Sequence, residues 1–144
     1  PDVKYNSVLL GRFINHIMEQ GKKALAEQIV YKALENISGK YKTDPFEIFN
    51  NALNNIKPYV EVKSRRVGGA SYQVPMPVNE ERGYFLACSW LKKYAGQRSE
   101  KTMINRIAEE LFEAANNRGA TIKKREYTHK MAESNKAFSH FASK

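Results

Sequence analysis

VEVKSRRVGGASYQVPMPV, which runs from Val60 to Val78, is the stretch that decides the fold. Before the Gly68-Gly69 pair, valines alternate with charged residues; after it, aromatic and apolar residues alternate with polar residues and prolines. Apolar residues at every second position are typical of β-strands, and a glycine pair between two such runs predicts a β-hairpin over about residues 59–78. Pro75 and Pro77 have no backbone N–H to donate, so neither run can be a central strand of a larger sheet.

On both sides of the hairpin, apolar residues recur with the 3.6-residue period of an α-helix. Six helices are expected: Ser7 to Gln20, Lys22 to Gly39, Asp44 to Pro58, Asn79 to Ala95, a fifth capped by Ser99 and continuing to Ala115, and a sixth from Ala120 with the weak apolar stripe Tyr127, Met131 and Phe138. The predicted fold class is therefore mainly α, a bundle of about six helices with one protruding β-hairpin. We expect it to form a single domain over residues 1–144.

The composition is strongly basic, because 24 Lys and Arg face 15 Asp and Glu and give a formal net charge of +9. Such an imbalance attracts polyanions, although a soluble basic protein without a nucleic-acid partner is the plain alternative. Cys88 is alone, which excludes an intramolecular disulfide, and the three histidines share no metal-ligand spacing. No phosphate-binding glycine loop, catalytic constellation or membrane-spanning run is visible. We therefore expect no enzyme, no cofactor, no metal and no membrane partner.

Basic residues gather in three clusters. At the hairpin, Arg65 and Arg66 shortly precede the glycine pair; glycine lets a backbone approach closely, and Arg presents a planar fork to phosphate. The second and third clusters are Lys92, Lys93, Arg98, Lys101 and Arg106, and Arg118, Lys123, Lys124, Arg125 and Lys130, whereas Glu109, Glu110 and Glu113 predict an acidic patch. This clustering favours an oriented polyanion-binding face, although a solvated helix surface is the alternative for any single lysine. Tyr72 follows the hairpin turn, and Tyr94 and Tyr127 follow runs of basic residues; each could stack on an RNA base or lie at the edge of the core.

Three segments resemble ribosomal small-subunit protein seven in its bacterial and organellar form: VEVKSRRVGGASYQVP (Val60 to Pro75), GKKALAEQIVYKALE (Gly21 to Glu35) and KKREYTHKMAESNKAFSHF (Lys123 to Phe141). The resemblance implies a protein that binds the 3′ major (head) domain of small-subunit ribosomal RNA and nucleates head assembly. It also implies a place near the tRNA exit site and the mRNA path, beside neighbouring head and platform proteins. Some bacterial members repress the messenger of their own operon. The implied location is the ribosome, in a bacterial cytoplasm or in an organelle (mitochondrial matrix or plastid stroma).

The resemblance and the charge clusters together give the candidate RNA-binding residues: Lys22, Lys23, Lys63, Arg65, Arg66, Gly68, Gly69, Lys92, Lys93, Arg98, Lys101, Met103, Arg106, Lys123, Lys124 and Arg125. The family usually carries a basic N-terminal arm before the segment that begins at Pro1, and these residues do not include it. Two other classes are open at this point. One is a sequence-specific DNA-binding helical protein, and the other is an adaptor whose hairpin adds a strand to a partner sheet.

Overall fold

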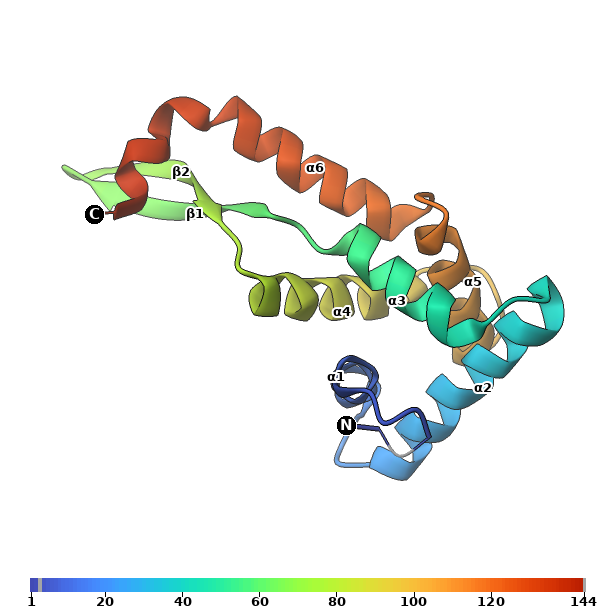
Figure 1. The fold of residues 1–144 in the computed structure, drawn as a ribbon. Coiled ribbons are helices and arrows are strands. Elements are labelled where there is room, and N and C mark those ends of the chain that lie inside the picture. The colour runs from blue at the N-terminus through green and yellow to red at the C-terminus, as the bar shows by residue number, and fades with distance from the viewer. Residues whose placement is uncertain (3, 144) are drawn as a thin grey trace.

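The computed structural model describes residues 1–2 and 4–143 and confirms a mainly helical fold with one two-stranded antiparallel hairpin (Figure 1). Six α-helices lie in the described part of the chain, as expected, and a short 3₁₀ segment follows them. In chain order the elements are α1 (Val8–Ile17), α2 (Lys23–Tyr41), α3 (Pro45–Ile56), β1 (Val60–Val67), β2 (Ala70–Pro77), α4 (Glu80–Gly96), α5 (Met103–Ala115), α6 (Ala120–Ser134) and η1 (Lys136–Ser143).

The core forms where α5 packs against α2, α3 and α4, with α1 lying across α2 and α4. Its fully buried side chains come from the apolar rows of these helices, for example Leu34, Leu53, Leu91 and Leu111. Burying one such side chain contributes about 1.5–3 kcal/mol of transfer free energy, so the rows that predict the helices also hold them together. The expected row on α6 is wrong: Tyr127 is 57% exposed, and Ala132 is among the residues that the helix buries instead.

Three helix boundaries differ clearly from the expectation. The first helix ends at Ile17, with Met18 as its C-cap, instead of continuing to Gln20. Thr102, not Ser99, caps α5, and its Oγ1 accepts the backbone N–H of Asn105 over 3.2 Å. The helix starts late because the Arg106 side chain donates to the carbonyl oxygen of Glu100 and holds that residue in the loop. The end of α2 is also later, since the chain turns at Lys42, whose φ is +54°.

Gly39 does not end α2, because glycine permits a left-handed turn without requiring one. Beyond it, Tyr41 stacks on Phe112 of α5 with ring centroids 3.5 Å apart, and this contact secures the last turn of the helix. The third helix begins as predicted: Asp44 Oδ1 accepts the N–H of Phe46 over 3.0 Å, and Pro45 occupies the first helical position.

The hairpin pairs Val67 with Ala70 across a two-residue turn made by Gly68 and Gly69. Figure 1 shows it extending away from the bundle, with α6 running alongside it and η1 folded back onto the ribbon. The pairing predicted from the alternating pattern is confirmed. The hairpin protrudes, but the C-terminal segment supports one side of it.

Candidate nucleic-acid interface

The turn of the hairpin presents backbone and positive charge to solvent. Gly68 and Gly69 are exposed with φ of +59° and +84°, and apart from their chain neighbours no atom lies within 4 Å of the place where a Cβ would be. Arg66 is exposed too, and its Nη2 donates to the carbonyl oxygen of Gly69 over 3.1 Å. This hydrogen bond holds the guanidinium over the turn, where a phosphate can approach both the cation and the backbone.

Arg65 and Arg66 lie on opposite faces of the hairpin, because successive side chains in a strand alternate. Arg65 is half-buried and opposes Tyr72, whose ring packs against Phe138 and Phe141 of η1 at centroid distances of 5.1 and 4.9 Å. Arg66, on the other face, is exposed. The structure therefore separates the two arginines and makes Arg66 the more accessible one. Tyr72 contributes to an internal aromatic cluster, which favours the edge-of-core interpretation of this residue.

The corner between α1 and α2 brings together three candidates that are distant in sequence. Lys22, Lys92 and Met103 line one cavity of about 360 Å³, with apolar residues of α2. Lys22 and Lys23 are exposed there, just after the left-handed turn at Gly21, where φ is +72°. This corner combines lysines with an apolar surface, a combination that suits the phosphates and bases of a nucleic acid.

Two arginines of the second cluster are bound within the protein. The guanidinium of Arg98 donates to both carboxylate oxygens of Glu100, over 2.9 and 3.1 Å, and to Glu110 over 3.1 Å. Hydrogen bonds from Arg98 hold the pKa of Glu100 below its usual range. Arg106 Nε donates to the carbonyl oxygen of Glu100 over 2.6 Å. These side chains shape the loop between α4 and α5, and the exposed Lys101 beside them is better placed to meet RNA.

The candidates on α6 also divide into exposed residues and residues bound within the protein. Lys123 is exposed, whereas Arg125 Nη1 donates to the carbonyl oxygen of Asn55 and ties α6 to the end of α3. The ammonium of Lys124 lies 5.7 Å from the ring centroid of Trp90 and 5.6 Å from that of Tyr127, within the range of cation–π attraction. A cavity of about 320 Å³ between the hairpin, α4 and α6 is lined by these three residues.

Lys63 and Lys93 are exposed as well, one on β1 and the other near the end of α4. The ammonium of Lys93 lies 5.4 Å from the ring centroid of Tyr94. Exposed candidates therefore lie at the hairpin, at the α1–α2 corner, near the end of α4 and on α6.

The glutamates of α5 do not form a free acidic patch. Glu109 accepts from Lys40 Nζ over 2.8 Å and from the Tyr41 hydroxyl over 2.6 Å. Glu113 pairs with Arg118 over 3.0 Å, and Glu110 is buried against Arg98. The expectation of an acidic surface is wrong, because each carboxylate meets a cation that arrives from a different part of the chain.

The base of the hairpin is joined to α6 through His129. The backbone N–H of Tyr59 donates to His129 Nε2 over 3.3 Å, and the two rings lie 4.1 Å apart. Burial, and secondarily the positive charge of Arg125, lowers the pKa of His129. The neutral ring therefore accepts the hydrogen bond that holds the hairpin base.

Sequence patterns did not single out Arg82, Phe85 or Trp90, although all three lie at the junctions of α4. Arg82 donates to both carboxylate oxygens of Glu61 over 3.2 and 3.3 Å, which ties α4 to β1. Phe85 is 51% exposed. For Phe85 and Trp90 the sequence did hold a clue: these large aromatic residues fall outside the apolar row of α4 that faces the core.

Among residues 1–2 and 4–143, His, Cys, Asp and Glu side chains nowhere gather in a group of three or more that could hold a metal ion. None of the helices in this described part combines the length and the apolar character that crossing a membrane requires.

Comparison with known proteins agrees with the resemblance in the sequence. Residues 1–136 match the family model for ribosomal protein S7p/S5e. Over 144 residues the chain is 67% identical to small ribosomal subunit protein uS7 of Rickettsia bellii, and 64% identical to the uS7 proteins of Rickettsia massiliae and Rickettsia felis. These alignments cover 100% of this chain and 88%, 90% and 91% of the respective relatives. The chain belongs to the ribosomal protein S7p/S5e family.

Proposed function

We propose that this chain is a structural constituent of the small ribosomal subunit that binds the 3′ major (head) domain of its ribosomal RNA and promotes assembly of that domain. Family membership and the names of the bacterial relatives support the ribosomal role. The observation that carries the RNA-binding part is the hairpin turn, where the exposed Arg66 lies over an open Gly68-Gly69 backbone.

The binding mechanism that we propose is electrostatic. Exposed lysines and arginines at the hairpin turn, the α1–α2 corner and α6 neutralise phosphates and release condensed counterions. The apparent affinity then falls with salt, with a logarithmic slope of about −0.7 to −0.9 for each phosphate contacted. The packed bundle and the internally bound arginines fix the positions of these charges, so that RNA helices are held at a set angle.

The hairpin and the C-terminal segment extend from the bundle together, so they are the parts best placed to reach other components. In the subunit we propose that the hairpin faces the mRNA path. The C-terminal end then lies towards exit-site tRNA or neighbouring head and platform proteins. In a bacterium, the same cations would bind the messenger of the protein's own operon when free protein accumulates.

The proposal is tested by measuring the binding of the full chain to a head-domain RNA fragment and to duplex DNA of equal length across a salt series. We expect RNA-selective binding with a steep salt dependence. Arg66→Ala should weaken binding and make the logarithmic salt slope shallower by about one. Lys32→Ala, an exposed change on α2 outside the three clusters, serves as the control and should leave the slope unchanged.

Two results would contradict the proposal. Equal competition by duplex DNA would favour the DNA-binding class instead. Failure to bind RNA, combined with salt-insensitive binding to a protein partner, would favour an adaptor.

A further inference from the structure

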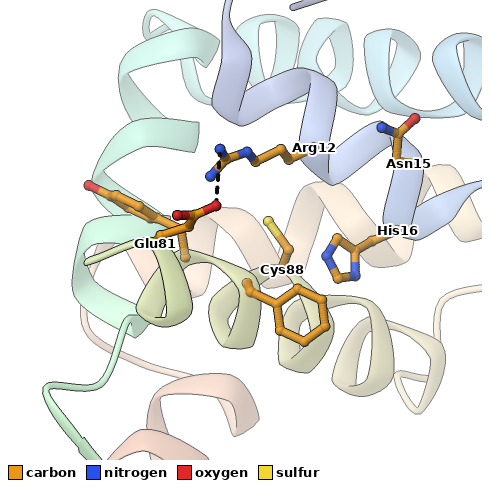
Figure 2. Close-up of a pocket in the computed structure, with 7 residues that line it drawn as sticks. Arg12, Asn15, His16, Glu81 and Cys88 are labelled. Carbon is orange, nitrogen blue, oxygen red and sulfur yellow. Dashed lines mark ion pairs between the residues drawn. The ribbon is translucent and has the colours of Figure 1, made fainter. Parts of the chain in front are cut away.

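A cavity of about 340 Å³ lies between α1 and α4 (Figure 2). This volume is at the small end of the range of about 300–1,000 Å³ that ligand pockets span, and it suits one planar group better than a helix or a loop. The lining residues are Arg12, Asn15 and His16 of α1 and Glu81, Tyr84, Phe85 and Cys88 of α4. Figure 2 shows Arg12 and Glu81 facing each other, with His16 beside Cys88.

The interior of this pocket is apolar and aromatic. Cys88 is 1% exposed, and burial raises the pKa of its thiol to about 12, so it contributes a small neutral surface. Phe85 is 51% exposed; its ring meets His16 edge-on, with centroids 5.0 Å apart, and the guanidinium of Arg82 lies 5.6 Å from the ring centroid. An aromatic ring that remains half in water beside a pocket offers a stacking surface for a flat ligand.

The mouth of the pocket carries one cation and one anion. Arg12 Nη2 lies 3.7 Å from Glu81 Oε1, and the two side chains are 47% and 81% exposed. An exposed pair at this distance contributes little to stability, so a ligand can separate the two groups at small cost. Glu81 repels phosphate, yet its two oxygens can accept two adjacent N–H donors.

Among the four RNA bases, guanine is the one whose Watson–Crick edge presents two adjacent donors, N1–H and the N2 amino group. We propose that this pocket binds one unpaired guanine of RNA, which stacks on Phe85 and donates N1–H and its N2 amino group to Glu81, while Arg12 beside Glu81 donates to the neighbouring O6 acceptor of the same base. The inference rests on the proposed function. The proposed function rests on contacts with the phosphate backbone, and this pocket would add a contact that recognises a base.

If Glu81 only stabilises the N-terminus of α4, its removal should not change which base the protein prefers. Glu81 lies in the first turn of α4, where a negative charge stabilises the helix N-terminus. Glu80 lies in the same turn but pairs with Lys57 over 3.4 Å, outside this pocket. Glu80→Gln is therefore the matched control for Glu81→Gln, because each change removes one charge from the same helix end.

The test measures binding of the full chain to three single-stranded RNAs by fluorescence anisotropy, with the three RNAs compared at each point of one salt series. The RNAs are a heptauridine, the same oligomer with a central guanosine, and the same oligomer with a central inosine, which lacks the N2 amino group. We expect the guanosine oligomer to bind at least about fivefold more tightly than the other two, the low end for a bidentate pair. Glu81→Gln should abolish this preference, and Glu80→Gln should preserve it.

The outcomes separate this inference from the proposed function. Salt-dependent binding of all three oligomers without preference for guanosine would overturn the guanine site and leave the proposed function intact. A preference that survives Glu81→Gln would also overturn it. Absence of salt-dependent binding to these oligomers and to the head-domain RNA would overturn both proposals together.

Discussion

Arg98 Nη1 lies 3.1 Å from Oε1 of Glu110, a carboxylate whose side chain is only 1% exposed. The other oxygen of Glu110 accepts from the backbone N–H of Thr121 over 3.2 Å and from its hydroxyl over 2.7 Å. One buried carboxylate therefore joins the α4–α5 loop to the first turn of α6, where backbone N–H groups have no partner within the helix.

Removing this carboxylate should destabilise the whole bundle. Glu110→Ala leaves the hydroxyl and N–H of Thr121 buried without an acceptor and takes one anion away from Arg98. Breaking a buried, hydrogen-bonded pair from one side costs about 3–5 kcal/mol. We expect the free energy of unfolding, measured by urea titration, to fall by about that amount.

Glu113→Ala on the same helix is the control. Its pair with Arg118 is largely at the surface, with the Arg118 side chain 57% exposed, so we expect a change below about 1 kcal/mol. Equal losses for the two variants would contradict a special role for Glu110.

Arg98 and Lys101 were predicted together as RNA-binding residues, and the structure predicts that they behave differently. Arg98→Ala should lower the free energy of unfolding because three hydrogen bonds to Glu100 and Glu110 are lost. Lys101→Ala, at an exposed position, should change stability by less than about 0.5 kcal/mol and weaken binding to head-domain RNA. Urea unfolding and salt-series RNA binding of both variants provide the measurements. A Lys101→Ala protein with unchanged RNA affinity would remove this residue from the interface.

Features that depend on neighbours in the chain could be predicted from the sequence. The period of two around Gly68-Gly69 predicted the hairpin, and Asp44-Pro45 predicted the start of α3, because strand alternation and helix capping are decided within a few residues. Clusters of basic residues likewise located the exposed Lys101 and Lys123.

Features that depend on contacts between distant segments could not be predicted in this way. Counting charges along the chain treats Arg98 and Lys101 alike, because Arg98 acquires its partner Glu110 only when α5 packs beside the loop. The guanine pocket has the same origin. Arg12 and Glu81 are far apart in sequence and meet only because α1 lies against α4.

Protonation of His129 at low pH should weaken the contact between the base of the hairpin and α6. Burial, and then the charge of Arg125, lowers the pKa of His129 from its usual 6.5, while the ring accepts the N–H of Tyr59. The unfolded chain therefore takes up this proton more readily than the folded chain does. The stability due to neutral His129 is present above pH 6.5 and is lost as the pH falls from there through the lower pKa of the folded state.

Urea unfolding between pH 7.5 and pH 5 tests this linkage. We expect the free energy of unfolding to fall less steeply over this interval in His129→Gln than in the parent protein. His16, whose pKa is also lowered by burial and by Lys92, keeps its contribution in both proteins, so the difference isolates His129. His140→Gln, an exposed change, controls for the loss of a histidine. If the free energy of unfolding falls with the same slope in the parent and in His129→Gln, protonation of His129 does not contribute to the loss of stability in acid.

Two glycine substitutions should change stability in opposite directions. At Gly119 the φ angle is +95°, and an added Cβ would lie 2.9 Å from Oε2 of Glu110, so Gly119→Ala combines backbone strain with a clash at the buried carboxylate. Backbone strain alone costs about 1–3 kcal/mol. Gly96, the last residue of α4, has no atom within 4 Å of its Cβ position apart from its chain neighbours and the backbone of its own helix. Gly96→Ala should therefore raise stability by about 0.4–1 kcal/mol by restricting the unfolded chain. Thermal unfolding should therefore show a lower Tm for Gly119→Ala and a slightly higher Tm for Gly96→Ala. If Gly119→Ala instead unfolds at the Tm of the parent protein, the first turn of α6 does not need the geometry that brings Thr121 to Glu110.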